Sequence, residues 1–388
     1  MFFQTLDNKN GCIGFYHDGG FLENIDDKCK TTWCQNSALA DKDIEFAQIY
    51  VEGKELDEVC PEHLKEGWQK LQTKMHNFYV SLQVSKVNLQ DVCFYDLLPP
   101  KFLKKYCEAK NEICAWIIEN HDKPKHYTLM KNILNFVSEI ETHKLNLDWE
   151  KINITNTKSR ALLRKKNSIS DKVQYDAWKT KTGRLATTQD SFPILTINKE
   201  SRSIIKPQND LFLELDYNSA ELRVAIGLMK MDQPTIDIHD WILENVFANK
   251  ITREKSKEKA FAWLYNVKAS NKKLEKMFDK QKILNYYYDL GRVNTMYDRS
   301  IEVDEKKALN YIIQSTTSDL VLTQVIKINK LLNKSFISFV VHDSVVIDVH
   351  RSEREKLNEI IEVFSKTDLG TFKTNVSLGK HFGDMRKV

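Results

Sequence analysis

The sequence has no long apolar run. A membrane-spanning helix needs roughly 18 or more consecutive apolar residues, whereas the most apolar segment, 336–349, is broken by His342, Asp343 and Asp348. The chain also starts with Met-Phe-Phe, without the basic residues that open a secretory signal. These absences predict a soluble intracellular protein with no membrane partner, and we expect it in the cytoplasm.

Glycine and proline are scarce, at 12 and 7 residues. Counts this low exclude collagen-like and proline-rich low-complexity chains. At roughly 100–200 residues per domain, the length instead allows two or three folded domains with a sizeable core.

Cysteine is absent after position 114. The seven cysteines are Cys12, Cys29, Cys34, Cys60, Cys93, Cys107 and Cys114. An odd number without a secretory signal argues against a disulfide framework, so we expect buried thiols. The alternative is a zinc site formed by Cys29, Cys34, Cys60 and His63, although its spacing is loose.

The whole chain has no strong excess of either charge: it contains 58 Lys and Arg and 54 Asp and Glu, for a net charge of +4. One window departs from this balance. Residues 250–282 hold eleven basic and four acidic residues, and so carry +7. Such a block suits a polyanionic partner, although a solvated lysine-rich helix face would look the same.

The order of predicted elements changes along the chain. Short apolar runs with turn residues predict strands in residues 1–50, and helical spacing dominates from 61 to 147. A basic patch at 158–166 follows. The later elements are predicted as a strand at 211–216, a helix at 219–229, the basic helical block at 250–282, a tyrosine-rich helix around 286–288, a helix at 304–332 and a hairpin at 336–349.

Two aspartates lie at predicted strand tips. Asp216 ends the strand at 211–216, and Asp343 lies in the turn of the hairpin. If the two strands are neighbours, the carboxylates can share a pair of divalent ions about 3.5–4 Å apart, as two-metal phosphoryl transfer requires. Taken alone, each aspartate has the simpler interpretation of a turn or cap residue.

Six short segments carry motifs of one known family. In chain order they are Thr182-Gly183-Arg184-Leu185, Asp216-Tyr217-Asn218-Ser219-Ala220-Glu221-Leu222-Arg223, Asp237-Ile238-His239, Arg253-x3-Lys257-x3-Phe261-x3-Tyr265, Asn310-x3-Gln314 and Val341-His342-Asp343. Together they resemble family A DNA polymerases, the group of bacterial DNA polymerase I and its phage relatives. Each motif alone is weak, but six in the expected order make coincidence a poor explanation.

The resemblance implies an α+β fold of the right-hand type, with an antiparallel palm sheet, helical fingers and a reduced helical thumb. A small N-terminal region would precede these parts. The implied boundaries are 1–60 for the β-containing N-terminal region, 61–170 for the thumb-like region, 171–235 for the first part of the palm, 236–290 for short fingers and 291–388 for the second part of the palm.

The implied activity is template-directed DNA synthesis, in which dNTPs are added to a primer 3′-OH by two-metal-ion nucleotidyl transfer. No convincing Asp-x-Glu exonuclease motif with partner acids is present, so we expect no proofreading. The rivals are a polymerase of different template choice, such as a reverse transcriptase, and a catalytically silent primer-template binding protein on the same scaffold. The implied source is a phage, and the expected location is then the host cytoplasm.

The metal ligands implied by the resemblance are Asp216, Asp343 and the backbone carbonyl of Tyr217. They would hold two Mg²⁺ ions, for which Mn²⁺ is a candidate substitute. Ser344 replaces the glutamate that usually follows the second catalytic aspartate. That glutamate is accessory, so metal affinity could be lower here.

The motif that begins at Arg253 places four residues at successive i+4 steps, so on a helix Arg253, Lys257, Phe261 and Tyr265 form one stripe. By resemblance, Arg253 and Lys257 bind the triphosphate, and Lys257 is the catalytic donor to the leaving pyrophosphate. Phe261 would lie over the incoming nucleotide, and Tyr265 near the templating base in contact with Glu221. The alternative is an amphipathic helix with its aromatic residues in the core.

Two further residues complete the implied nucleotide site. His239 would touch the triphosphate, and Glu221 would act as a steric gate that leaves a ribose 2′-hydroxyl without room. Glu221 therefore favours a DNA product but leaves the template open. The residues implied to contact the primer-template are Arg184, Arg299, Lys306, Asn310, Gln314 and His342.

Lys306 stands where the family commonly has arginine, and would lose a bidentate contact. Asn266 follows Tyr265 where glycine is typical, and the fingers are shortened. The expected partners are a DNA primer-template and dNTPs. A replication accessory protein is a further candidate partner, and the chain itself is expected to be a monomer.

Overall fold

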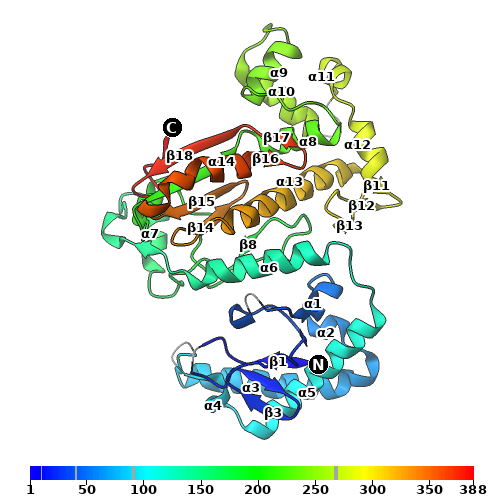
Figure 1. Ribbon diagram of the computed structural model, residues 1–388, viewed down its shortest axis with the longest axis vertical. Helices are drawn as coiled ribbons and strands as arrows, with labels where there is room; N and C mark the ends of the chain where they lie inside the picture. The colour runs from blue at the N-terminus through cyan, green and yellow to red at the C-terminus, as the bar shows by residue number, and fades with distance from the viewer. Residues whose placement is uncertain (10, 40–41, 90–91, 266–269) are drawn as a thin grey trace. The chain divides into compact units, whose positions relative to one another are not determined.

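The computed structural model describes residues 1–9, 11–39, 42–89, 92–265 and 270–388. Asn266 lies outside these residues. The chain divides into two compact units, Met1–Glu139 and Ile140–Val388, which are drawn in Figure 1. The boundary falls within helix α6 (Tyr127–Thr142), inside the segment 61–170 that the sequence analysis assigns to one thumb-like region.

Unit Met1–Glu139 combines small sheets with helices. Its strands are β1 (Phe3–Thr5), β2 (Phe15–His17), β3 (Gly20–Leu22), β4 (Thr31–Thr32) and β5 (Glu45–Phe46). Strands β1 to β3 form an antiparallel sheet, and β4 pairs with β5 in parallel. The short strands predicted in the first 50 residues are thus confirmed.

Helices make up most of the rest of this unit. They are the 3-10 helix η1 (Ser37–Leu39) and the α-helices α1 (Ala47–Tyr50), α2 (Leu56–Val59), α3 (Glu62–Val84), α4 (Phe94–Leu97) and α5 (Pro100–Asn120). Helix α5 begins with Pro100, whose missing N–H has no partner at that position in any case. Trp68 of α3 packs with Ile113 and Ile117 of α5 in one buried apolar cluster.

One expectation about the cysteines is wrong. Cys12 and Cys93 form a disulfide, while the other five are free thiols. The pairing joins loops 81 residues apart in sequence, which tertiary contacts bring together. Asp7 accepts a hydrogen bond from the Phe94 backbone N–H (2.9 Å). Spacing in the sequence carries no trace of such a contact.

The suggested zinc site is also wrong in its membership. Among the described residues, the one group of three or more His, Cys, Asp or Glu side chains close enough to share a metal ion consists of His17, Asp26 and Cys29. It does not include Cys34, Cys60 or His63.

Unit Ile140–Val388 is built on a five-stranded antiparallel sheet of order β14-β15-β10-β18-β19. Its strands are β10 (Leu211–Tyr217), β14 (Phe336–Val341), β15 (Ser344–Val349), β18 (Thr374–Gly379) and β19 (Arg386–Lys387). Strand β10 lies at the centre of the sheet, and in its second half Glu214 and Asp216 alternate with buried apolar residues, as is common in antiparallel sheets. The predicted strand at 211–216 and the hairpin at 336–349 are confirmed.

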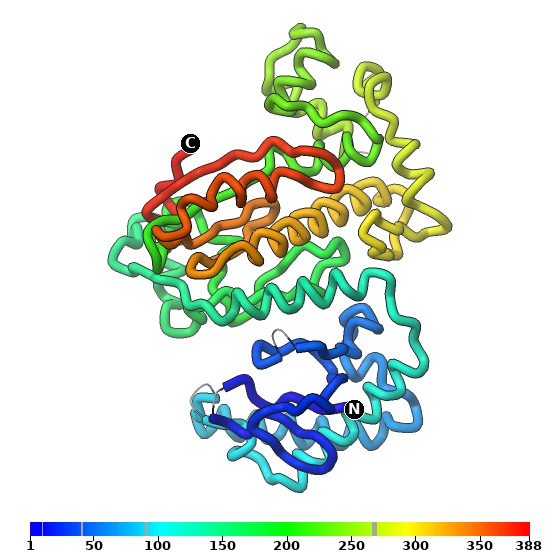
Figure 2. The backbone as a smooth tube through the Cα atoms, viewed as in Figure 1, coloured from blue at the N-terminus to red at the C-terminus, as the bar shows by residue number. Residues whose placement is uncertain are grey.

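Helices α8 (Ala220–Leu228), α13 (Glu305–Asn329) and α14 (Leu357–Ser365) accompany the sheet, and α13 contacts both of the others. Helices α9 (Ile238–Asn245), α10 (Arg253–Tyr265), α11 (Lys272–Met277) and α12 (Lys280–Tyr287) extend away from it, as the tube in Figure 2 shows. The basic block at 250–282 therefore comprises α10, α11 and the start of α12.

The remaining elements of this unit are short. They are β6 (Asn146–Leu147), η2 (Trp149–Lys151), α7 (Thr157–Arg164), β7 (Tyr175–Asp176), β8 (Ala186–Thr187), η3 (Lys199–Ile204), β9 (Ile205–Lys206), β11 (Tyr288–Asp289), β12 (Arg292–Asn294), β13 (Ser300–Glu302), η4 (Arg351–Lys356), β16 (Lys366–Thr367) and β17 (Gly370–Thr371). None of the helices that the structure describes has the length and hydropathy to cross a bilayer.

Candidate active site

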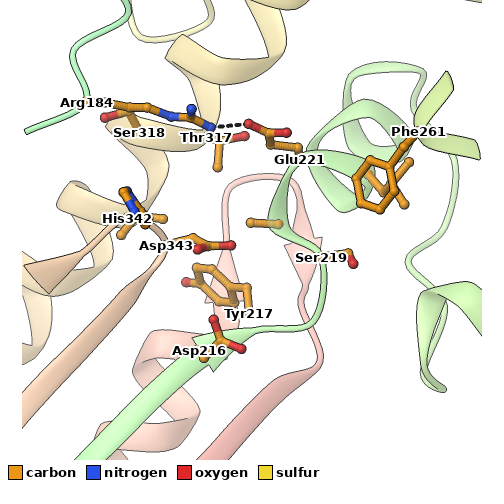
Figure 3. Close-up of a pocket in the computed structure, with 13 residues that line it drawn as sticks. Arg184, Asp216, Tyr217, Ser219, Glu221, Phe261, Thr317, Ser318, His342 and Asp343 are labelled. Carbon is orange, nitrogen blue, oxygen red and sulfur yellow. Dashed lines mark hydrogen bonds and ion pairs between the residues drawn. The ribbon is translucent and has the colours of Figure 1, made fainter. Parts of the chain in front are cut away.

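The two strand-tip aspartates meet at one end of the sheet. Strand β10 pairs with β15 so that Asp216 lies opposite Ser344, and Asp343 immediately precedes Ser344 in the β14–β15 turn. Both carboxylates face a cavity of about 480 Å³ (Figure 3). Its lining residues are Arg184, Asp216, Tyr217, Ser219, Ala220, Glu221, Leu222, Phe261, Thr317, Ser318, Val321, His342 and Asp343.

The electrostatics of this pair favour a cation. Burial and then the neighbouring Asp343 raise the pKa of Asp216 to about 6, against a weaker opposing effect of Asn375. Burial also raises the pKa of Asp343. Two half-buried carboxylates repel each other when both are ionised, and a divalent ion between them would remove that cost. Carboxylate oxygens are the ligands that Mg²⁺ prefers, so the donor set fits the implied metal.

The side chain of Tyr217 points into the core beside the cavity. Its side chain is buried, stacks on Phe364 with ring centroids 4.3 Å apart, and donates a hydrogen bond to the Phe364 carbonyl (2.5 Å). The phenol is thus committed to the core. Any metal contact by Tyr217 has to use its carbonyl oxygen, as the resemblance implies.

Two residues at the cavity have left-handed backbone. His342, with φ of 57°, is the first residue of the β14–β15 turn, and Ser219, with φ of 54°, is the N-cap of α8. Non-glycine residues adopt this conformation at a cost, and such strain gathers at functional sites. The backbone at His342 determines how the next residue, Asp343, is oriented. The backbone at Ser219 determines how the first turn of α8, which carries Glu221, is oriented.

Glu221 is held by an ion pair. Its carboxylate accepts a hydrogen bond from Arg184, and a dashed line joins the two side chains in Figure 3. Burial raises the pKa of Glu221, and Arg184 opposes this shift. The carboxylate is therefore anchored at one wall of the cavity rather than free to move.

Arg299 has a different place from the one implied. It is 8% exposed, and its guanidinium donates to both carboxylate oxygens of buried Asp319, at 3.0 and 2.7 Å. A Cβ at Gly183, where φ is +74°, would lie 2.7 Å from that guanidinium, so only glycine fits there. Ser318 also donates to the Gly183 carbonyl (2.8 Å). The resemblance implies a primer-template contact for Arg299; in the structure this residue lies against the turn that presents Arg184.

The implied stripe of four residues lies on α10. The Phe261 and Tyr265 rings are stacked with centroids 5.9 Å apart, and Lys257 Nζ lies 5.9 Å from the Phe261 ring. Phe261 lines the cavity. Arg253 forms ion pairs with Asp237 (2.9 Å) and Asp240 (2.6 Å).

The implied contact between Tyr265 and Glu221 is not a hydrogen bond. The buried Tyr265 hydroxyl has no hydrogen-bond partner among the described residues, and Glu221 pairs with Arg184 instead. The Phe261 ring lies beside the His239 ring, with centroids 5.7 Å apart.

His239 lies next to the cavity as a buried side chain. One ring nitrogen, Nε2, is 2.8 Å from Ser219 Oγ, while Nδ1 is buried without a hydrogen-bond partner among the described residues. Burial lowers the pKa of the ring, which favours its neutral form. Asp237 caps helix α9 by accepting from the backbone N–H of His239 (2.9 Å), so it orients this segment.

Helix α13 presents a polar face to the cavity. Thr317, Ser318 and Val321 line it, and Gln314 and Asn310 precede them at helical spacing on the same face. Asn310 Oδ1 is buried without a hydrogen-bond partner among the described residues. Lys306 and His342 are exposed.

The fold of this chain is similar to that of a solved structure. The chain is similar to the POL domain of Pol1 from M. smegmatis, solved in complex with DNA primer-template and dNTP. The chain shares the fold of a DNA polymerase domain. The TM-score is 0.57 and the identity 14%, over 89% of this chain and 83% of that one. No protein-family profile and no curated protein matches the sequence.

Three groups of site residues escaped the sequence analysis. Asn375 of β18 lies opposite Asp216 and donates a hydrogen bond from Nδ2 to its Oδ2 (3.1 Å). This contact depends on strand register alone, so the sequence carries no signal for it. Ser219, at the start of α8, forms a hydrogen bond with His239 of α9. The positions of Thr317 and Ser318 could have been found, since they follow Gln314 by three and four residues.

Proposed function

We propose that this protein is a template-directed DNA polymerase that adds dNTPs to a primer 3′-OH by two-metal-ion nucleotidyl transfer. The observation that carries the proposal is the adjacency of Asp216 and Asp343 in a cavity that also holds Glu221 and Phe261. Two Mg²⁺ ions, or Mn²⁺ in their place, would activate the attacking hydroxyl and neutralise the leaving pyrophosphate. Asp216, Asp343 and the carbonyl of Tyr217 would hold them.

The triphosphate would bind along α10. Arg253 and Lys257 supply cations one helical turn apart, and His239 lies next to the ring of Phe261. Lys257 forms no ion pair with another described residue, so its ammonium group is available to donate a proton to the pyrophosphate. Arg253 would exchange Asp237 and Asp240 for phosphate oxygens. Cations placed where charge develops lower the barrier itself.

Sugar choice would rest on Glu221. Arg184 fixes its carboxylate at the cavity wall, and a fixed side chain excludes a 2′-hydroxyl more effectively than a mobile one. Phe261 would cover the base and sugar of the incoming nucleotide, with Tyr265 behind it near the templating base.

The primer-template would lie against the polar face of α13. Asn310, Gln314 and Arg184 would read minor-groove acceptors that every base pair presents, and exposed His342 would contact the primer end. Lys306 and the basic segment 158–166 would hold backbone phosphates in a salt-dependent manner.

In this proposal the five-stranded sheet belongs to the palm, and helices α9 to α12 form the fingers. The boundaries are those implied by the resemblance, 171–235 and 291–388 for the palm and 236–290 for the fingers. Segment 61–170 would supply the thumb. The proposal includes the absence of proofreading and a monomeric enzyme of phage type.

Primer extension on a DNA template tests the proposal. With Mg²⁺, the intact protein should extend the primer with dNTPs and not with rNTPs, and Asp343→Asn should abolish extension while duplex binding persists. Duplex binding without extension by the intact protein would support the silent binder instead. Faster extension on an RNA template than on DNA would support reverse transcription.

A further inference from the structure

Three side chains of metal-ligating types lie close together in unit Met1–Glu139 and do not belong to the cavity described above. His17 ends strand β2, and Asp26 and Cys29 lie in the segment between β3 and β4. One ligand atom from each of the three lies within 4.8 Å of the other two. His17 and Cys29 are buried, at 9% and 3% exposed, and Asp26 is at the surface.

Local structure holds the three side chains in place. The Cys29 N–H donates to the Asp26 carbonyl (3.2 Å), and the Lys28 N–H donates to Asp26 Oδ1 (2.9 Å). This turn places the side chains of Asp26 and Cys29, which are three residues apart in the sequence, on the same side of the backbone. The β2–β3 hairpin pairs His17 with Gly20 and so brings the imidazole to the same point from another element.

The backbone on the far side of the turn is also restrained. The amino terminus of Met1 donates to the Lys28 carbonyl (3.1 Å), and the Thr31 N–H donates to the Met1 carbonyl (3.2 Å). The Asp26–Cys29 turn is therefore anchored to the N-terminal strand. A pre-formed set of ligands costs less ordering entropy on binding than a flexible one.

The donor set selects the metal. Magnesium and calcium take oxygen ligands, whereas a thiolate with an imidazole and a carboxylate suits zinc. Three protein ligands leave the fourth position of a tetrahedral zinc to water, and exposed Asp26 places that position at the surface. A metal-free cluster, in which the Cys29 thiol remains protonated beside Asp26, is the competing explanation.

We propose that His17, Asp26 and Cys29 bind one zinc ion that stabilises the N-terminal sheet. Strands β1 to β3 have three residues each, and β4 and β5 have two. Sheets this short hold few ladder hydrogen bonds, and small scaffolds commonly add disulfides or metals. The Cys12–Cys93 disulfide joins one part of this region to α4, and the zinc would join β2 to the segment before β4. On binding, the Cys29 thiol releases its proton to solvent and the sulfur coordinates the metal.

Metal binding by the full chain tests this proposal without reference to polymerase activity. The protein is stripped with a chelator, dialysed, and titrated with Zn²⁺ or Co²⁺. We expect one Zn²⁺ per chain by native mass spectrometry, a higher unfolding temperature, and a thiolate-to-cobalt charge-transfer band in the Co²⁺ form.

Matched variants separate the site from the other thiols and acids. Cys29→Ser should remove the cobalt band, while Cys34→Ser should retain it. Asp26→Asn alters only an exposed side chain and should weaken Zn²⁺ binding by at least about 10-fold, since even outer-shell changes cost that much. Asp27→Asn, the exposed neighbour, should leave binding unchanged.

Two outcomes would overturn the proposal. One is no stoichiometric Zn²⁺ in the folded intact protein, which would leave a hydrogen-bonded thiol cluster. The other is a cobalt band that Cys29→Ser and Cys34→Ser reduce equally, which would show non-specific thiol binding. A protein that fails in primer extension but binds one zinc through Cys29 would refute only the proposed polymerase function.

Discussion

Asp216 and Asp343 are 127 residues apart in the sequence, yet they lie at adjacent strand tips because β10 pairs with β15 with Asp216 opposite Ser344. Each carboxylate is half-buried, and the proximity of Asp343 adds to the effect of burial in raising the pKa of Asp216. The pair is thus poised to gain free energy from a divalent cation. A single aspartate at a strand tip would have no neighbouring carboxylate whose repulsion a cation could relieve.

Asn375 is expected to position Asp216. Its hydrogen bond to a carboxylate is of a kind that contributes about 1.5–3 kcal/mol. Asn375→Ala should therefore lower the rate of nucleotide incorporation by roughly 10-fold or more and raise the Mg²⁺ concentration needed for half-maximal rate. Ser377→Ala is the matched control on the same face of β18, opposite Glu214. An equal loss in both variants, or an unchanged Mg²⁺ requirement in Asn375→Ala, would show a merely structural role.

Sugar discrimination should depend on the size of residue 221. Glu221→Ala opens space for a 2′-hydroxyl and should raise ribonucleotide incorporation by at least about 10-fold. Glu221→Gln keeps the volume without the charge and should retain most of the discrimination. Arg184→Ala releases the side chain and should give an intermediate value. Relative kcat/KM for dNTPs and rNTPs is the measurement, and equal values for the Ala and Gln variants would sink the steric explanation.

Phe261 should make the enzyme resist dideoxy terminators, as the resemblance to the family implies. Phe261→Tyr adds a hydroxyl at the cavity wall and should raise dideoxynucleotide incorporation by at least about 10-fold, with little change for normal dNTPs. Tyr265→Phe is the control, because it removes a buried hydroxyl that has no hydrogen-bond partner among the described residues. Efficient termination by the unaltered protein would contradict this prediction.

Glu353 should stabilise the fold in a pH-dependent way. Burial opposes its ionisation, but hydrogen bonds led by the Ser335 backbone N–H lower its pKa to about 2. Its carboxylate accepts from Ser335 (2.7 Å) and Lys334 (3.2 Å) just before β14. A pKa below its unfolded value gives stability that is present above about pH 4.5 and lost as the pH falls towards 2.

Glu353→Gln should accordingly lower the free energy of unfolding at neutral pH by about 1–3 kcal/mol. The difference from the unaltered protein should shrink on acidification through that window. Urea unfolding at several pH values measures it. A difference that stays constant with pH would show that the charge of Glu353 plays no part.

The elements that carry the site could be predicted because their signals are local. Residues 211–216 read as a buried strand, and the i+4 spacing of Arg253, Lys257, Phe261 and Tyr265 indicates one helical stripe. Both follow from backbone geometry, which repeats over a few residues. The sequence did not predict that β10 pairs with β15. It indicated only that the two aspartates could share metal ions if these strands were neighbours.

What the sequence could not predict depends on contacts between distant segments. Nothing in the spacing of Arg299 indicates that it pairs with Asp319 and lies against Gly183. Cys12 looked like one thiol among seven, and only the packing of its loop against residues 92–94 selects Cys93 as its partner. No spacing rule encodes either arrangement.

The sequence by itself predicted the strand at 211–216, the hairpin at 336–349 and the helical stripe that begins at Arg253, because these depend on side-chain type and local periodicity. Only the tertiary structure decided that Asn375 orients Asp216, that Arg184 anchors Glu221, and that Cys29 joins His17 and Asp26. The physical reason is that each of these contacts depends on strand register or on loops packed across long separations, where many alternative pairings have similar local energies.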